Sequence, residues 1–235
     1  SIIPHGGLHL IPWRVLFRKL GLDWCQLPCE IDFGLMLRPL SAARHTVNLS
    51  SCAALGFGTA AMGAQSIDLG EESTAVAHSL GCGCETIVPC SQSDVLRCLR
   101  DKNIVFLSCH GSVTNTGAMP KLSLLLSGGP VPIEKCLPTR IPARLVIMSA
   151  CESGIYFVGY GDYPVGAVPA LLRSGAGCCI ASRFEVGAEF ARKFFQSFAL
   201  RLANGENVSD AFVHTCEEQE LEGRDLWCDL GCLEI

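Results

Sequence analysis

Two side chains that are able to do covalent chemistry follow two apolar runs of the sequence. His110 comes directly after the run 104–109, and Cys151 comes two small residues after the run 145–148. A short apolar run bounded by turn residues is typical of a buried strand. A thiol is nucleophilic only as the thiolate, and a nearby imidazole can accept its proton. The sequence therefore predicts a Cys–His nucleophile pair at the ends of two strands.

Alternating strands and helices are the elements that must position this pair. Glu71 and Glu72 fall in the first turn of one predicted helix, where acidic residues favour the helix dipole. This alternation predicts an α/β fold, with a mostly parallel sheet and helices on both faces. The carboxyl ends of adjacent parallel strands open into one crevice, so we expect His110 and Cys151 to meet there. Helices are predicted at 68–80, 91–102, 165–173, 188–202 and 208–218, and strands at 84–88, 104–108, 122–126, 145–149 and 177–182.

The rest of the chain gives weaker patterns. Further expectations are short strands within 2–13, weak strands at 31–37 and 46–49, a mobile loop at 155–163 and a final strand at 227–233. No repeat or linker divides the chain, so we expect one domain over 1–235, with 1–67 a less clearly patterned N-terminal subregion and 68–235 the catalytic core. Because the sequence starts without an initiator Met, we expect a fragment of a longer protein.

Composition excludes several classes of protein. The chain has 235 residues, of which 49% are hydrophobic, enough for a substantial core. Its net charge is −5 and its 18 Lys and Arg residues are scattered, which argues against direct binding of nucleic acid. No apolar stretch approaches the roughly 18 residues that a membrane span needs. We therefore expect a cytoplasmic protein without a membrane partner.

Fifteen cysteines raise the question of metal and disulfide sites. No Cys-x-x-Cys pair is present, so a zinc site is not expected, and we predict neither a metal nor another cofactor. A disulfide framework belongs to small secreted chains, whereas this chain is large and its number of thiols is odd. Reduced thiols that pack as small apolar side chains fit better. Cys151 differs from most of them because it follows a strand instead of lying within one.

Five segments in order resemble the CHAT family, a caspase-like group that is related to separases and often fused to TPR repeats. The opening IIPHGGLHLIPW is similar to the first motif of the family, FLSCHG to its His-Gly motif and LVIMSACESG to its Ser-x-Cys-x-Ser-Gly motif. VGAVPALLRSGAGCCIAS resembles the helix and strand after the nucleophile, and NGENVSDAF the closing helix. The order and spacing of these segments make the resemblance specific.

The resemblance implies a caspase-type fold and a cysteine peptidase without metal, in which His110 and Cys151 form the catalytic pair. Cys151 would attack the scissile carbonyl, and His110 would transfer protons near neutral pH. Gly111 has no Cβ, so its N–H can approach a substrate closely. Together with the N–H of Cys151 it would form an oxyanion hole.

Two residues are candidates for the substrate pocket. In relatives that cleave after Lys or Arg, an Asp stands two residues before the nucleophile, and here that position is Ser149. We therefore expect an uncharged pocket floor that disfavours a basic side chain. Arg183 follows the strand 177–182, where caspases place an arginine that receives an acidic side chain. The favoured alternative is that Arg183 is a solvated charge at the strand end or pairs with Glu185 or Glu189.

Three functions remain open from the sequence. The first is an endopeptidase that cleaves a protein partner, as CHAT proteins of bacterial antiviral defence do, and that a TPR-type region or a sensor protein activates by ordering the loop 155–163. The second is a catalytically silent CHAT module that only docks partner proteins. The third is an acyl or thioester hydrolase that uses the same pair. The retained His and Cys favour the first.

Overall fold

A six-stranded sheet forms the centre of the computed structural model, which describes residues 20, 47–62, 65–81, 83–114, 121–158, 164–182, 186–221 and 233–234. The strands lie in the order β13, β12, β9, β5, β1, β4. All neighbours pair in parallel except β12 and β13. Their bounds are β1 Cys52–Phe57, β4 Cys84–Ile87, β5 Ile104–Cys109, β9 Leu145–Ser149, β12 Cys178–Ser182 and β13 Leu233–Glu234.

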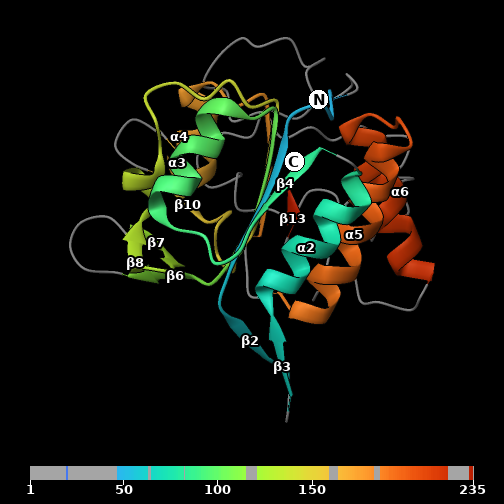
Figure 1. Ribbon diagram of the computed structural model, residues 1–235, viewed down its shortest axis with the longest axis horizontal. Coiled ribbons are helices and arrows are strands. Elements are labelled where there is room, and N and C mark those ends of the chain that lie inside the picture. The colour runs from blue at the N-terminus through green and yellow to red at the C-terminus, as the bar shows by residue number, and fades with distance from the viewer. Residues whose placement is uncertain are drawn as a thin grey trace.

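Helices cover both faces of this sheet (Figure 1). One face carries α2 (Leu69–Leu80), α5 (Ala188–Ala203) and α6 (Val208–Leu221), and the other carries α3 (Gln92–Asp101) and α4 (Ala167–Ser174). Strand side chains alternate between the two faces, so the sheet separates two apolar clusters. The expectation of an α/β fold with a mostly parallel sheet and helices on both faces is confirmed.

Local sequence explains where two of these helices begin. The side chain of Asp68 caps α2 by accepting a hydrogen bond from the N–H of Gly70 at 2.7 Å. Ser91 and Asp94 form a reciprocal capping box at the start of α3. Both helices therefore start close to the residues that the sequence predicts.

Aromatic side chains fill the core under α5 and α6. Phe194 is fully buried, and its ring contacts those of Phe195 and Phe212 edge to face, with centroids 5.4 and 5.5 Å away. Such pairs add to the burial of a large apolar area. The cluster fixes α5 against α6 and against the sheet, and one wall of the candidate site is built on α5.

Replacing Phe194 with alanine is expected to lower the free energy of unfolding by about 3–5 kcal/mol, because the substitution leaves a cavity in a closely packed core. Urea denaturation followed by circular dichroism measures the change. Leu200→Ala on the same helix is the control, since Leu200 is 54% exposed, and there we expect a change within about 0.5 kcal/mol. An equal loss in both variants would contradict the assigned packing.

Small antiparallel units project from the main sheet. β2 and β3 form a hairpin between β1 and α2, β6 to β8 form a three-stranded sheet after β5, and β10 pairs with β11 after β9. Their bounds are β2 Thr59–Met62, β3 Gln65–Asp68, β6 Gly111–Thr114, β7 Lys121–Leu126, β8 Gly129–Pro132, β10 Tyr156–Val158 and β11 Pro164–Gly166, and a 3-10 helix spans Ile133–Cys136.

Some sequence expectations need correction. The weak strand at 46–49 is wrong where the structure describes it, because residues 47–50 are loop and turn, with Asn48 Oδ1 accepting from the N–H of Ser50 at 2.9 Å. The strand begins at Cys52 instead, inside the N-terminal segment 1–67. The predicted loop 155–163 begins with β10. The strands expected within 2–13 and at 31–37 lie outside the described residues, as does most of the strand expected at 227–233.

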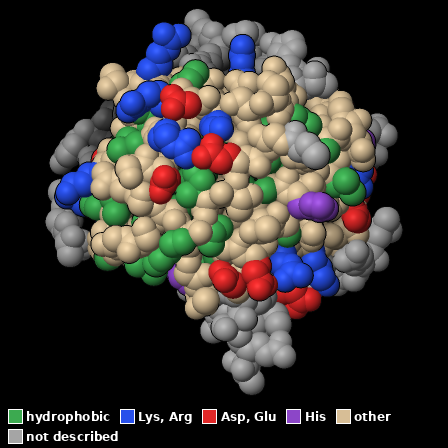
Figure 2. Space-filling view, viewed as in Figure 1, with side chains coloured by type: hydrophobic (Ala, Val, Ile, Leu, Met, Phe, Trp, Pro, Cys, Tyr) green, Lys and Arg blue, Asp and Glu red, His purple; other side chains and the backbone are tan. Residues whose placement is uncertain are grey.

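The surface mixes charges of both signs. Figure 2 shows acidic and basic side chains interspersed over the viewed face instead of a single basic stripe. Arg97 and Lys102 both pair with Glu85, at 2.7 Å each. Within the described ranges, no helix is long and apolar enough to cross a membrane.

Candidate active site

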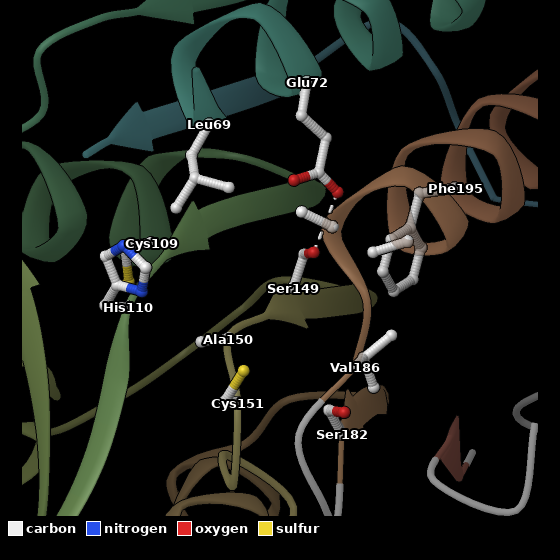
Figure 3. A pocket seen from close by; sticks show the side chains of 12 residues that line it. Leu69, Glu72, Cys109, His110, Ser149, Ala150, Cys151, Ser182, Val186 and Phe195 are labelled. Carbon is white, nitrogen blue, oxygen red and sulfur yellow. Dashed lines mark hydrogen bonds between the residues drawn. The ribbon is translucent and has the colours of Figure 1, made fainter. Parts of the chain in front are cut away.

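His110 and Cys151 line one cavity of about 60 Å³ at the carboxyl edge of the sheet (Figure 3). β5 and β9 are parallel neighbours, with Ser108 opposite Ser149 in register. His110 lies one residue after β5, and Cys151 lies two residues after β9. Figure 3 shows the sulfur of Cys151 directed into the space that His110 and Ser149 border. The fold therefore brings together the two side chains that the sequence pairs.

A main-chain carbonyl holds the imidazole ring. Nε2 of His110 lies 2.5 Å from the carbonyl oxygen of Thr59, at the start of β2. A carbonyl can only accept a hydrogen bond, so Nε2 carries the proton, and in the neutral ring Nδ1 is the basic nitrogen. Gly58 has a φ of +101°, and a Cβ there would lie 3.2 Å from Cδ2 of His110. Gly58 thus leaves room for the ring, and the carbonyl of Thr59 fixes its tautomer.

Gly111 lies against the turn after β9 that carries Cys151, the candidate nucleophile, which we call the nucleophile turn. A Cβ at this position would overlap the carbonyl oxygen of Cys151, so only glycine fits. The hydrogen-bond pattern of the β6–β7 ladder shows that the N–H of Gly111 does not bond to β7 and can donate to another group. The N–H of Leu125 donates to the carbonyl of His110 at 2.8 Å, which makes the next pair, Gly111 and Leu124, a non-hydrogen-bonded pair of the β6–β7 ladder. In such a pair the N–H points away from the neighbouring strand.

The turn that carries Cys151 is tied to β12. Ser153 is buried, and its hydroxyl donates to the carbonyl of Met148 and accepts from the N–H of Ser182, both at 3.3 Å. The N–H of Gly154 donates to the carbonyl of Ser182 at 2.7 Å. A Cβ on Gly154 would come within 3.1 Å of Ser182 backbone atoms. The Ser-Gly pair after the nucleophile therefore docks the turn onto the adjacent strand.

Glu152 connects the two strand ends. It has a φ of +60°, a left-handed conformation that is uncommon outside glycine. Its Oε2 accepts a hydrogen bond from the N–H of Val113 on β6 at 3.3 Å. The strained residue beside Cys151 thus fastens the nucleophile turn to the strand that follows His110.

A family model for the CHAT domain matches residues 1–218. The chain belongs to the CHAT family. The resemblance expected from the five sequence segments is thereby confirmed. Among solved structures, this CHAT chain is similar to gingipain R, which is described as an Arg-specific cysteine proteinase, at 13% identity with a TM-score of 0.49. That match covers 78% of this chain and 46% of gingipain R, so the chain spans under half of that protein. A search of curated proteins finds no match.

Glu72 is the residue of this CHAT domain that sequence reasoning missed. The sequence pattern placed Glu72 in the first turn of a helix, where its charge favours the helix dipole, but it did not predict that the side chain is only 1% exposed and lines the same cavity as Cys151. Ser108 donates to Oε2 of Glu72 at 2.5 Å, and Ser149 donates to Oε1 at 2.8 Å. Burial raises the pKa of the carboxyl to about 7, although the serine hydrogen bonds act in the opposite direction.

A signal for Glu72 exists in the sequence. Leu69, Glu72, Val76 and Leu80 are spaced as one face of a helix, and the three apolar members are buried. A carboxyl on the buried stripe of an amphipathic helix needs partners in the core, which the hydroxyls at the ends of β5 and β9 supply.

The predicted pocket residues have different outcomes. Ser149 lines the cavity, and its partner Glu72 brings a carboxyl group to a pocket whose floor we expected to be uncharged. Arg183 lies outside the described residues, as does Glu185. Among the described side chains, no group of three His, Cys, Asp or Glu residues is arranged to hold a metal ion.

Burial separates most of the other described thiols from Cys151. Burial raises the pKa of Cys90 to about 12 and that of Cys98 and Cys136 to about 11. It raises the pKa of Cys109, which is next to His110 in sequence, well above the usual range. Cys151 is half-buried in the turn after β9. Among the cysteines that line this cavity, Cys151 is therefore the one suited to react as a thiolate.

Proposed function

We propose that this chain is a cysteine endopeptidase of the caspase-like type that uses His110 and Cys151 to cleave a protein partner. The observation that carries the proposal is the placement of these side chains in one cavity at the ends of adjacent parallel strands. Membership of the CHAT family supports a cysteine peptidase. The hydrogen bond from His110 to Thr59 supports a ring that is oriented for proton transfer.

In the proposed reaction, the thiol of Cys151 gives its proton to Nδ1 of His110, and the resulting thiolate attacks the scissile carbonyl carbon. The oxyanion that forms accepts hydrogen bonds from the N–H groups of Gly111 and Cys151. His110 then donates a proton from Nδ1 to the leaving amine, and the peptide bond breaks to give a thioester. A water molecule then gives a proton to Nδ1 and attacks the thioester, which releases the carboxylic acid and the thiolate and leaves the other proton on His110.

Control by a partner is also part of the proposal. CHAT domains are often fused to TPR repeats, and a TPR-type region or a separate sensor would order the segment between β10 and β11, which follows the nucleophile turn. The proposed setting is bacterial antiviral defence in the cytoplasm, where thiols stay reduced.

Reactivity toward a small alkylating agent tests whether Cys151 is activated. We expect iodoacetamide at pH 7 to modify Cys151 about tenfold or more faster in the parent protein than in His110→Ala, because the imidazole that shares its cavity can accept the thiol proton. Mass spectrometry of the digested protein gives the rate at each cysteine. Cys84, which lies outside the cavity, is the internal reference and should react at the same rate in both proteins. Equal rates at Cys151 in the two proteins would instead favour the silent docking module.

A further inference from the structure

A buried carboxyl group faces the nucleophile across the candidate cavity. Glu72 extends from α2 into the site, and Figure 3 shows it on the wall opposite Cys151, with Ser149 between them. Catalysis by the His–Cys pair does not need this group. Its burial on the wall opposite Cys151 therefore indicates another role at the same site.

The partners of Glu72 are neutral. Its two oxygens accept hydrogen bonds from the hydroxyls of Ser108 and Ser149. Among the described Lys and Arg residues, none forms an ion pair with it, and the exposed Arg192 acts only from a distance. With a pKa of about 7, the carboxyl is partly ionised at neutral pH. A buried carboxylate without a counterion is unfavourable, and a cation that enters the cavity would relieve it.

The rest of the cavity suits a long side chain with a charged end. Leu69, Val186 and Phe195 contribute apolar surface around the carboxyl. Lys and Arg bury their methylene stems against such surface while the charged head meets a polar partner. Ser149 donates its proton to Glu72, so the lone pairs of its oxygen can accept a hydrogen bond from an incoming ammonium or guanidinium group.

We propose that this cavity is the primary specificity pocket of the peptidase and that it binds the basic side chain, Lys or Arg, of the residue before the scissile bond, with Glu72 as the counterion. The inference rests on the proposed peptidase function. This inference reverses the expectation that a pocket with Ser149 disfavours a basic residue. The carboxyl group that binds the base comes from Glu72 on α2 instead of from an Asp at position 149. Ser149 then acts as the group that holds the carboxyl in place.

Matched peptide substrates test the pocket. Two pairs of fluorogenic peptides differ only in the residue before the scissile bond, Arg against citrulline and Lys against norleucine, so that each pair differs in charge and little in shape. We expect kcat/KM to be about 100-fold or more higher for the cationic member, since a site with a buried charge rejects an uncharged analogue. Glu72→Gln should remove most of this preference. Glu71→Gln, an exposed carboxyl in the same turn of α2, should keep it.

The pH dependence of the preference separates recognition from a merely structural role. Arg and citrulline substrates share the same His–Cys chemistry, and the guanidinium stays charged, so the ratio of their kcat/KM values follows the ionisation of Glu72. The ratio should rise as the pH goes from 6 to 8, because the carboxylate form increases as the pH passes about 7. In Glu72→Gln the ratio should not change with pH. A Glu72 that only stabilises the fold would leave the ratio flat in the parent protein.

The outcomes distinguish a wrong pocket from a wrong enzyme. If citrulline and norleucine peptides are cleaved as fast as the cationic ones, and Cys151→Ala abolishes that cleavage, the pocket inference fails while the peptidase stands. If no peptide is cleaved and Cys151 shows no enhanced alkylation, the peptidase fails. Calorimetric titration with agmatine then tests the pocket without catalysis. Agmatine binding that Glu72→Gln does not weaken would overturn the pocket inference. Ser149→Ala is the second variant if Glu72→Gln does not fold, and it should reduce the same preference.

Discussion

Replacing Cys151 with alanine is expected to eliminate peptidase activity, with kcat reduced on the order of 10⁴-fold or more, because no thioester can form. His110→Ala should cause a similar loss, since an unassisted thiol attacks slowly and cannot protonate the leaving amine. The double variant should be little worse than either single one, because residues that act as a unit have non-additive effects. Continuous cleavage of a fluorogenic peptide by the purified full chain measures all three.

Cys84→Ala is the matched control for this loss. Cys84 is a half-buried thiol on the edge strand β4, outside the cavity, and its removal should leave kcat unchanged. Circular dichroism of each variant shows whether the fold is retained. Substantial cleavage by a folded Cys151→Ala protein would assign the chemistry to another group and end the proposal of a His–Cys pair.

Gly111→Ala is expected to have the second largest effect on activity. The new Cβ would overlap the carbonyl oxygen of Cys151, so the His-Gly segment and the nucleophile turn must move apart. That movement would displace one donor of the proposed oxyanion hole, and the loss of such a donor reduces kcat by about 10²- to 10³-fold. Both backbone segments also lose close packing, so the melting temperature should fall as well.

Gly128→Ala provides the comparison for this substitution. Gly128 lies in the turn between β7 and β8, where an added Cβ meets nothing within 4 Å. Kinetics and thermal unfolding of both variants under the same conditions separate crowding at the active site from the general effect of losing a glycine. Full activity in Gly111→Ala would mean that the segment relaxes without moving the donor, which would remove Gly111 from the proposed oxyanion hole.

Short-range patterns predicted the parts of the site that depend on neighbouring residues. β5 and β9 are largely apolar runs, and each ends close to a residue that we propose as catalytic, so the candidates His110 and Cys151 are found from their position along the chain. The parallel sheet then brings them together because β5 and β9 are neighbours. Capping residues such as Asp68 likewise mark the helix starts.

β1 escaped prediction although it lies inside the sheet. Its sequence, CAALGF, consists mostly of small residues and lacks the branched side chains that mark a strand. The structure explains the small residues, because α2 crosses β1 closely. A Cβ on Gly56 would lie 2.8 Å from Cα of Gly70 and 2.9 Å from the carbonyl oxygen of Leu69. Close packing between helix and strand thus removed the pattern that would have identified the strand.

Glu72 escaped for a different reason. Its burial depends on Ser108 and Ser149, which lie 36 and 77 positions away along the chain. Helix spacing alone places Glu72 on the inner face of α2. Only the assembled sheet places the hydroxyl groups of Ser108 and Ser149 within hydrogen-bond distance of it. A local pattern does not contain that information, so the charged side chain was assigned to the helix dipole.

The hydrogen bond between His110 and Thr59 has a consequence for how this family can diversify. The acceptor is a backbone oxygen, which every amino acid possesses, so no replacement at position 59 deletes it. Selection on the ring's orientation therefore acts on the path of the chain and falls on Gly58, where a φ of +101° and the nearby imidazole disfavour any other residue. We therefore expect position 59 to accept other residues without loss of this hydrogen bond, so that its contribution comes from the backbone and not from the side chain.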